Sequence, residues 1–256
     1  MNQSIIHEAR EATPLIHHLT NQVVMNFSAN GLLSFGAAPV MAKAEEEAAD
    51  MAYNADGVLL NIGTLTADDL SSMVRAGVAA NEKGIPVVLD PVGVAATPFR
   101  KTAVKNILEQ VKPTVIKGNA GELAHLVEIP WETKGVESVG DGNADEIAAK
   151  VAKMYQTAAV VTGKTDVICI ENEILQNHTG HPILGKITGA GCLLGSVLSA
   201  CLTTNESIGQ QAMTAAAFYG LAAEHAAERT DVNGPGTFLP HFIDALSLNP
   251  AALERK

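Results

Sequence analysis

The chain has 256 residues, of which 47% are hydrophobic and 18% are charged, and its formal net charge is −11. This length predicts one large domain or two small ones, with enough apolar residues for a sizeable core. The acidic balance disfavours nucleic-acid binding, which depends on Lys and Arg, and no apolar run reaches the roughly 20 residues that a bilayer requires.

The amino-terminal segment, MNQSIIHEAREATPLIHHLT, mixes charges and histidines with short apolar pieces. It lacks the basic start and the apolar block of a secretion signal. The three cysteines of the chain form no CxxC pair and no even disulfide framework. Reduced thiols and the missing signal predict a cytoplasmic location.

From residue 56 to residue 164, short β-branched runs alternate with Ala-rich segments that favour helices. The runs are continuously apolar, as is typical of strands covered on both faces. Thr66, followed by acidic residues in TADDL, predicts a helix N-cap. Repeated alternation predicts parallel βαβ units and an α/β fold with helices on both faces of the sheet. The predicted strands are 56–63, 85–93, 113–119 and 158–164, and the predicted helices are about 66–83, 98–111, 120–128 and 143–156.

The last third of the chain has a different pattern. Residues 189–229 are mostly helical in pattern, with a break at TTNES, and 207–229 form a long helix rich in small residues. The segment NGPGTF (233–238) predicts a turn. Because no Pro/Ser-rich linker, low-complexity tract or repeat interrupts the sequence, we expect one domain over residues 1–256.

Polar residues and glycine follow each of the four predicted strands. Asn61, Asp90, Lys117 and Thr162 stand at these strand ends. In α/β folds, ligands bind beyond the carboxyl ends of the strands. One such residue would be an ordinary feature of a βα turn, but four together predict the rim of an active site.

Two carboxylates on neighbouring strand ends, Asp90 and Glu122, are oxygen ligands of the kind that Mg²⁺ takes together with phosphates and water. The alternatives are a turn residue before Pro91 and an acid in the first turn of a helix. Lys117 offers a cation for a phosphate, or is simply a solvated lysine. Thr162 offers a hydroxyl, or is simply a β-former at the end of its strand.

The segment TGAGC (188–192) precedes an apolar helical run. Backbone N–H groups at a helix N-terminus bind anions, and glycine allows close approach. No P-loop motif occurs in the chain. Cys192 would lie in the first helical turn, where the helix dipole favours a thiolate. The alternatives are a tight turn and a small buried hydrophobic residue, which is the interpretation for Cys169 and Cys201.

These segments, with LTNQVVMNFSANGLLSFGAAPVM (19–41) and VTG (161–163), resemble the hydroxyethylthiazole kinase family of ribokinase-like enzymes. The resemblance covers nearly the whole chain, up to GPGTF. It implies a three-layer αβα domain with a mostly parallel sheet and no β lid. It also implies ATP- and Mg²⁺-dependent phosphorylation of the primary alcohol of 5-(2-hydroxyethyl)-4-methylthiazole in thiamine salvage. A homotrimer with active sites at subunit interfaces is implied as well.

The same resemblance implies roles for individual residues. Cys192 stands where most ribokinase-like enzymes carry an aspartate base. Lys117 replaces an expected arginine, so a bidentate phosphate contact becomes a point charge, and Lys164 stands where an acidic residue is common. The implied catalytic residues are Gly189, Ala190, Gly191 and Cys192; the thiazole-site residues are Asn21, Val23, Met41 and Gly189; the ATP-site residues are Lys117, Asn119 and Thr162; and the metal-site residues are Asp90 and Glu122.

The protonation state of Cys192 stays open at the level of sequence. The helix N-terminus lowers the pKa of the thiol, whereas bound phosphates raise it. Because phosphoryl transfer has a loose transition state, we expect Cys192 to assist without being indispensable. The alternative functions are a related kinase for hydroxymethylpyrimidine or pyridoxal, a hydrolase with Cys192 as nucleophile, and a non-catalytic nucleotide sensor.

Overall fold

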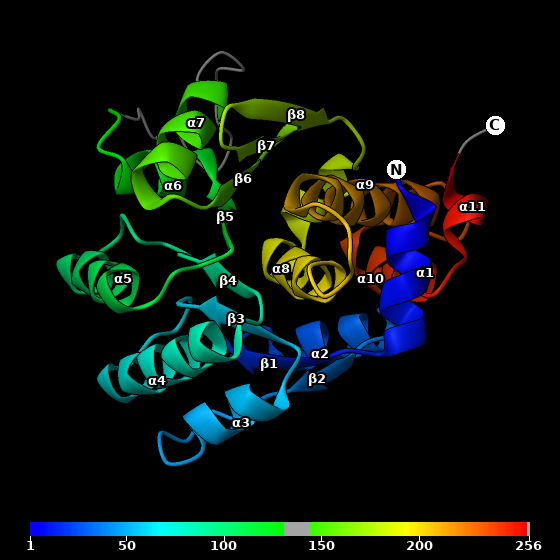
Figure 1. Ribbon diagram of the computed structural model, residues 1–256. Coiled ribbons are helices and arrows are strands. Elements are labelled where there is room, and N and C mark those ends of the chain that lie inside the picture. The colour runs from blue at the N-terminus through cyan, green and yellow to red at the C-terminus, as the bar shows by residue number, and fades with distance from the viewer. Residues whose placement is uncertain (131–143, 255–256) are drawn as a thin grey trace.

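The computed structural model describes residues 1–130 and 144–254, and its elements form three layers (Figure 1). In the described part of the chain, eight strands form one sheet with the order β2-β1-β3-β4-β5-β6-β7-β8. Helical layers cover both faces, which confirms the predicted α/β class and three-layer architecture. The strands are β1 (Leu15–Leu19), β2 (Ala38–Val40), β3 (Gly57–Asn61), β4 (Val87–Asp90), β5 (Val115–Asn119), β6 (Ala158–Thr162), β7 (Asp166–Ile170) and β8 (Glu173–Asn177).

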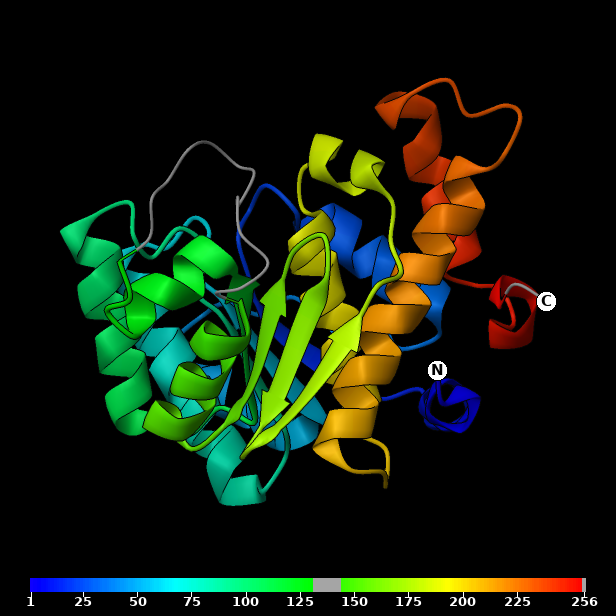
Figure 2. The ribbon, with the colours of Figure 1, turned by 90° about the horizontal axis from the view of Figure 1, so that it is seen from above.

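The sheet is mostly parallel, as expected. Strands β2, β1, β3, β4, β5 and β6 pair in parallel, whereas β6, β7 and β8 pair antiparallel at one edge (Figure 2). The apolar runs in the sequence predicted β3 to β6 but not β1, β2, β7 and β8. The two histidines of β1 (LIHHL) interrupt its apolar residues, although the strand is buried. Strand β8 is largely exposed and contains polar residues. Neither strand therefore has the continuous apolar run that predicts a buried strand.

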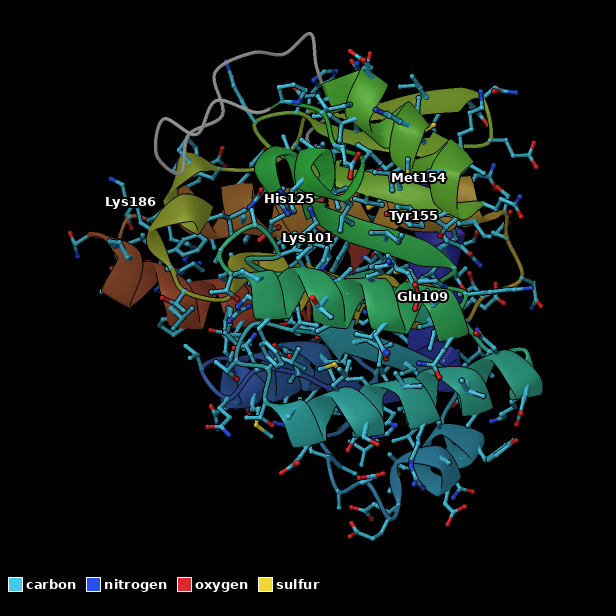
Figure 3. The ribbon with its side chains drawn as sticks, turned by 90° about the vertical axis from the view of Figure 1, so that its left-hand side faces the viewer. Lys101, Glu109, His125, Met154, Tyr155 and Lys186 are labelled. Carbon is cyan, nitrogen blue, oxygen red and sulfur yellow. The ribbon has the colours of Figure 1, made fainter. Side chains whose placement is uncertain are left out.

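One face of the sheet carries helices from the middle of the chain (Figure 3). They pack through one apolar cluster that includes Leu60, Leu89 and Ile116 of the strands. On this layer the hydroxyl of Tyr155 donates to the carbonyl of Leu126 (3.0 Å) and ties the last two helices together. The helices are α3 (Ala48–Asn54), α4 (Ala67–Lys83), α5 (Pro98–Gln110), α6 (Ala120–Leu126) and α7 (Ala144–Tyr155).

The other face carries helices from both ends of the chain, and the two termini lie on this side (Figure 1). These helices share a second apolar cluster with Leu59, Val88 and Val115. In the described residues, no helix has the length and apolar character needed to cross a membrane. The elements are α1 (Gln3–Ala12), α2 (Met25–Phe35), the 3-10 helix η1 (Pro182–Lys186), α8 (Ala190–Cys201), α9 (Ile208–Ala227), α10 (Pro235–Ala245) and α11 (Pro250–Leu253).

The predicted helices agree with the structure, with residue 143 of the 143–156 prediction lying outside the described residues. Thr66 is the N-cap of α4 and forms a capping box with Asp69. The predicted turn at 233–238 is wrong, because α10 begins at Pro235. Proline lacks the N–H that a helix interior needs, but it is well suited to the first helical position.

The alternation of side chains along the strands determines where the polar strand ends lie. Leu59, Val88 and Val115 belong to the cluster beneath α8. Since side chains two residues apart share a face, Asn61, Asp90 and Lys117 project to that same face, one step nearer the carboxyl edge. Gly195 of α8 lies directly over this face, since a Cβ there would be 3.3 Å from Leu59 Cδ1 and 3.8 Å from Asp90 Oδ2.

Candidate active site

A row of polar residues crosses the carboxyl edge of the sheet. Asn61 of β3 lies opposite Asp90 of β4, and Asn119 of β5 lies opposite Thr162 of β6. The parallel register therefore brings the strand ends together, as the sequence predicted. Asn61, Asp90 and Lys117 are each at most 2% exposed, so the centre of the row is buried beneath α8.

Asp90 and Lys117 form a buried ion pair, with Lys117 Nζ 2.9 Å from Asp90 Oδ2. Burial raises the pKa of Asp90 to about 6, against the opposing effects of the Lys117 charge and the Asn61 amide. Burial lowers the pKa of Lys117, but the charges of Asp90, Cys192 and Glu122 outweigh it and hold the pKa above its ordinary value. The 2.9 Å contact and the burial of both side chains show that Lys117 is paired with Asp90 and is not a solvated lysine.

Asn61 connects this pair to the amino-terminal loop. Its Nδ2 donates to Asp90 Oδ2 (3.0 Å), and its Oδ1 accepts from Asn21 Nδ2 (2.9 Å) and from the backbone N–H of Gly63 (3.0 Å). Asn21 Nδ2 also lies 3.4 Å from Cys192 Sγ. The structure thus joins Asn21, Asp90, Lys117 and Cys192, which are far apart in sequence, through Asn61, which was predicted only as one of four polar strand ends.

Glu122 occupies the first turn of α6 and accepts from two backbone amides. Its Oε1 accepts from Gly93 N and its Oε2 from Asn119 N, both at 2.9 Å. The Asn119 side chain accepts from Glu122 N in return (2.9 Å), which completes a capping box. The charge of Glu122 still acts on Asp90, whose pKa it raises. Glu122 therefore links the loops after β4 and β5 as well as adding negative charge to the site.

The N-terminus of α8 lies above the polar row. Gly189 has a left-handed φ of 89°, and a Cβ there would be 2.4 Å from a methyl carbon of Val24, so only glycine fits. Gly189 also offers no side chain to cap the helix. The Lys117 ammonium lies 3.6 Å from where a Gly191 Cβ would be. Amides of the first turn and a cation below them together favour an anion at this position.

Cys192 is the third residue of α8, as predicted, and is 9% exposed. Burial raises the pKa of its thiol, and so does Asp90, whereas Lys117 and the amides of Asn61 and Asn21 lower it. The raising effects prevail, so the protein alone keeps Cys192 as a neutral thiol at neutral pH. Cys169 and Cys201 are fully buried, in agreement with their interpretation as core residues.

The interpretation of Cys192 as the nucleophile of a hydrolase finds no partner base in His178 or His181, the two histidines nearest to it in sequence. His181 accepts from Ile183 N at the start of η1, and His178 pairs with Thr165. The partner that the structure shows for the Cys192 thiol is the Asn21 amide. A thiol held by an amide lacks the activating base that such a mechanism requires.

Two further features support the site and were missed at the level of sequence. Arg100 donates to the carbonyls of Ile62, Gly63 and Val92, and so connects the loops that follow β3 and β4. His18, beneath the site, has Nδ1 2.9 Å from the Ile16 carbonyl and Nε2 3.0 Å from Ser196 Oγ. No motif marks either residue, because their partners are backbone groups or lie on other elements.

The other residues expected at a thiazole site, Val23 and Met41, make no side-chain hydrogen bond with this network among the described residues. Val23 is 67% exposed, and Met41 is half-buried in the segment after β2. Leu33 on α2 is also exposed, at 58%. Val23 therefore presents an exposed apolar side chain beside Val24, on which the Gly189 loop packs.

The fit of a magnesium ion depends on which oxygens are free. Among the described residues, no group of three or more His, Cys, Asp or Glu side chains is arranged to hold a metal. Asp90 Oδ1 is buried without a hydrogen-bond partner in that part of the chain, whereas both Glu122 oxygens accept from amides. Since Mg²⁺ usually takes one or two carboxylates plus water and phosphate, Asp90 Oδ1 fits the ion.

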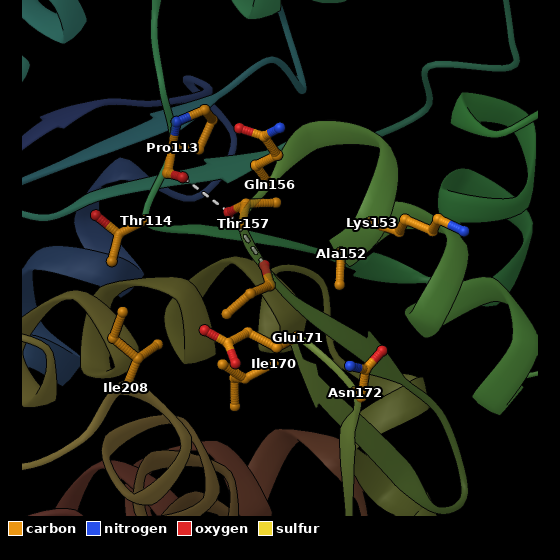
Figure 4. Close-up of a pocket in the computed structure, with 11 residues that line it drawn as sticks. Pro113, Thr114, Ala152, Lys153, Gln156, Thr157, Ile170, Glu171, Asn172 and Ile208 are labelled. Atoms are coloured by element: carbon orange, nitrogen blue, oxygen red, sulfur yellow. Dashed lines mark hydrogen bonds between the residues drawn. The ribbon is translucent and has the colours of Figure 1, made fainter.

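A separate groove of about 540 Å³ lies at the opposite end of the strands, between β6, the β7–β8 turn and the start of α9 (Figure 4). Thr157, its most buried polar side chain, already donates to the Pro113 carbonyl (2.7 Å). The other polar residues there are exposed or half-exposed. The groove therefore lacks the unpartnered buried groups found at the carboxyl edge.

Comparison with known proteins gives one consistent result. Residues 6–250 match the profile of the hydroxyethylthiazole kinase family. The chain is 60% identical over 253 residues to hydroxyethylthiazole kinase 1 of Oceanobacillus iheyensis, covering 99% of this chain and 98% of that protein. It is 45% identical to hydroxyethylthiazole kinase of Exiguobacterium sp., covering 96% of this chain and 93% of the relative.

The solved structures agree. The hydroxyethylthiazole kinase protein of Pyrococcus horikoshii OT3 superposes with a TM-score of 0.87 at 37% identity, covering 95% of this chain and 91% of that chain. A ribokinase-like superfamily protein of Enterococcus faecalis superposes with a TM-score of 0.67 at 13% identity, over 96% of this chain and 94% of that chain, which shows the shared fold.

Proposed function

The chain belongs to the hydroxyethylthiazole kinase family, and from this premise we propose how its residues carry out the reaction. The enzyme is a kinase that phosphorylates the alcohol of the hydroxyethylthiazole, the thiamine-salvage activity, rather than hydroxymethylpyrimidine or pyridoxal. The observation that carries the residue roles is the buried row of Asn61, Asp90 and Lys117 under the α8 N-terminus. It supplies negative charge, positive charge and backbone donors at one edge of the sheet.

The backbone amides of Gly189 to Cys192 bind the oxygens of the transferring phosphoryl group in this proposal. Gly191 is exposed, so a phosphate can approach these amides from solvent. Phosphoryl transfer depends mainly on positioning and on charge stabilisation, which such donors supply without moving. Lys117 contributes from below the helix end, through its charge rather than through a bidentate contact.

ATP is the proposed phosphate donor and Mg²⁺ the proposed metal. We assign Asn119 and Thr162, which pair on adjacent strand ends, to the nucleotide phosphates. Asp90 Oδ1 would hold the ion, with Glu122 adding negative charge nearby. When bound, Mg²⁺ neutralises charge on the phosphates. Asp90 is ready for this contact because Lys117 and Asn61 already hold its other oxygen.

Cys192 is the proposed acceptor of the alcohol proton, a role that only its thiolate form can fill. Before substrates bind the thiol form prevails and already holds its proton, so it must first lose that proton to solvent and its contribution is limited. A general base contributes about 10²–10⁴-fold in rate, and a loose transition state releases the proton late. We therefore expect Cys192→Ala to lose part of kcat and Cys192→Ser to lose less.

Turnover of Cys192→Ala, Cys192→Ser and Cys192→Asp tests this role. Full activity of the Ala variant would show that the thiol takes no proton. An Asp variant that folds and binds ATP but is inactive would show that the position is not a carboxylate-type base site.

A homotrimer with active sites between subunits is part of the same proposal. Exposed Val23 supports it, because an apolar side chain beside Val24 and the Gly189 loop is suited to burial by a neighbouring subunit. We also propose that residues 1–256 act as one kinase domain, since the described strands share one sheet. A cytoplasmic location agrees with the three free cysteines.

An ATP-coupled assay with the thiazole alcohol, the pyrimidine alcohol and pyridoxal tests the function. We expect turnover with the thiazole alcohol to exceed that with the other two by orders of magnitude. Preference for either competitor would overturn the assignment. Sedimentation of the intact protein tests the trimer separately, and a monomer at assay concentration would contradict it.

A further inference from the structure

We propose that Asn61 is a positioning residue for phosphoryl transfer: it holds the substrate-side amide of Asn21 and the phosphate-side carboxylate of Asp90 in one fixed arrangement. The proposal rests on the roles proposed above for those two residues. Asn61 is 1% exposed at the end of β3, so it acts through its neighbours rather than on the substrates.

The orientation of the Asn61 amide follows from its backbone contact. The N–H of Gly63 can only donate, and it lies 3.0 Å from one end of the side chain, which must therefore be the oxygen. The other end is then the NH₂ group, which faces Asp90 Oδ2 at 3.0 Å. A flipped amide would put oxygen against carboxylate and NH₂ against N–H, so the backbone of the β3 loop determines the orientation.

That orientation determines how Asn21 is presented. Because Asn61 Oδ1 is an acceptor, Asn21 turns its own Nδ2 toward it (2.9 Å), and the same NH₂ group faces Cys192 Sγ (3.4 Å). Gly63 provides the space, since a Cβ at that position would lie 2.8 Å from the Asn21 side chain. Rotation of Asn21 would place its oxygen against that of Asn61, so Asn21 keeps its donor toward the thiol.

Asn61 also selects which oxygen of Asp90 is available. Lys117 Nζ and Asn61 Nδ2 both contact Oδ2, at 2.9 and 3.0 Å, while Oδ1 has no hydrogen-bond partner among the described residues. Oδ1 is the atom assigned above to the metal. Loss of the Asn61 donor would free the carboxylate to rotate about the single Lys117 contact, and the free oxygen would no longer be defined.

An amide is the side chain that meets both requirements at this position. A carboxylate in place of Asn61 would still accept from Gly63 and Asn21, but it would oppose Asp90. An alanine would lose the contacts to Asn21 and Gly63 as well as the contact to Asp90. The two substitutions therefore separate the proposed functions of Asn61, because Asn61→Asp keeps the hydrogen bond to Asn21 and Asn61→Ala keeps none of these contacts.

The test combines binding and turnover on the full chain. Calorimetry measures the Kd of 5-(2-hydroxyethyl)-4-methylthiazole without nucleotide or metal, and the ATP-coupled assay measures kcat and KM. The variants are Asn61→Ala, Asn61→Asp, Asn21→Ala and the Asn21/Asn61 double alanine. Asn81→Ala is the control, since the Asn81 side chain also accepts from and donates to backbone groups. Its partner is Lys112, which precedes β5 at the amino ends of the strands.

We expect Asn61→Ala to raise the Kd about tenfold and to lower kcat by about 10- to 100-fold, the effect of losing hydrogen bonds to a charged group. Asn61→Asp should lower kcat in the same range while keeping the Kd within about threefold. On the Asn21→Ala background, Asn61→Ala should raise the Kd by less than about twofold, because its route to the substrate is already lost. Asn81→Ala should change none of these values.

Asn61 variants with the Kd and kcat of Asn81→Ala would overturn the proposal, and so would additive effects of Asn21→Ala and Asn61→Ala on the Kd. If Asn61→Ala fails to fold, Asn61→Asp decides, since unchanged kcat in that variant would also overturn it. A wild-type chain that neither binds nor phosphorylates the alcohol would instead overturn the proposed function, and with it this role of Asn61.

Discussion

The two ends of the parallel strands are built differently. The amino end, near Pro113 and Thr157, has an open groove of about 540 Å³ whose buried polar group is satisfied. The carboxyl end has a buried ion pair and an unpartnered carboxylate oxygen under a helix N-terminus. Burying charge is costly unless it is paired, so a fold retains it where it is used. The candidate site is therefore marked by buried charge and an unpartnered carboxylate oxygen, which the groove at the amino end lacks.

The strongest test of this contrast compares one lysine at each end. Lys117→Met leaves Asp90 buried without its cation, which should lower the free energy of unfolding by about 3–5 kcal/mol. Lys153→Met, at the exposed groove, should change it by less than about 0.5 kcal/mol. Urea unfolding measures both values. Equal losses in the two variants would show that the Asp90–Lys117 pair has no special place in the structure.

A second test uses acid, because His18 lies buried beneath the carboxyl end. Burial lowers the pKa of His18 from 6.5 to about 4. Between those values the unfolded chain binds the proton and the folded chain does not. The contribution of neutral His18 to the free energy of unfolding is therefore fully present above pH 6.5. It is lost as the pH falls toward 4, by up to about 3 kcal/mol.

Urea unfolding between pH 7 and pH 4 measures this loss, with His18→Gln as the comparison. The variant should have a shallower dependence of unfolding free energy on pH. Parallel curves for the wild type and the variant would show that His18 is not the group responsible.

A third test concerns the loops at the carboxyl end. Arg100→Ala removes the donors to the Ile62, Gly63 and Val92 carbonyls and should lower the free energy of unfolding by about 2 kcal/mol, with a parallel loss in kcat/KM. Arg75→Ala is the control, because Arg75 is exposed and pairs only with Glu45 among the described contacts. That pair should be worth at most about 1 kcal/mol. Unchanged kcat/KM in Arg100→Ala would separate this arginine from the site.

The smallest effect is expected at the amino end. Thr157→Val removes the hydroxyl that donates to Pro113 and should lower the free energy of unfolding by about 1 kcal/mol, while kcat and KM stay within about twofold of wild type. The same assay and unfolding measurements apply. A tenfold loss of kcat/KM in a folded Thr157→Val protein would give the groove a role in the reaction and break the contrast.

Much of the fold was predictable because the central strands carry continuous apolar runs between helical patterns. Strands β3 to β6 and helices α4 to α9 were predicted within a few residues. Strands β1 and β8 were not, since β1 contains His17 and His18 and β8 is exposed, so tertiary pairing forms both strands despite their weak local signal. The predicted turn at 233–238 failed because Pro and Gly also begin helices, as Pro235 does in α10.

The residues of the candidate site were predictable in type but not in their contacts. Asp90, Lys117 and Cys192 stood out by position at strand ends and at a helix start. Only the structure shows that Lys117 points inward and pairs with Asp90, and that the Asn21 amide contacts Cys192 Sγ. Asn61 was visible only as another polar strand end, and Arg100 and His18 carried no signal, because a hydrogen bond to a distant backbone group leaves no local pattern.

The sequence by itself determined which residues lie at the carboxyl edge and on which face of the sheet. Side chains two residues apart lie on the same face of a strand, which is a local property of extended backbone. This relation holds for Leu59 and Asn61, for Val88 and Asp90, and for Val115 and Lys117. Only the tertiary structure decided how far these polar side chains are buried and how their pKa values shift. The register of three strands and the close approach of α8 remove water from the row, and that burial raises the pKa of Asp90 to about 6 and keeps Cys192 a neutral thiol. Burial depends on neighbours from the whole chain, so no short stretch of sequence records it.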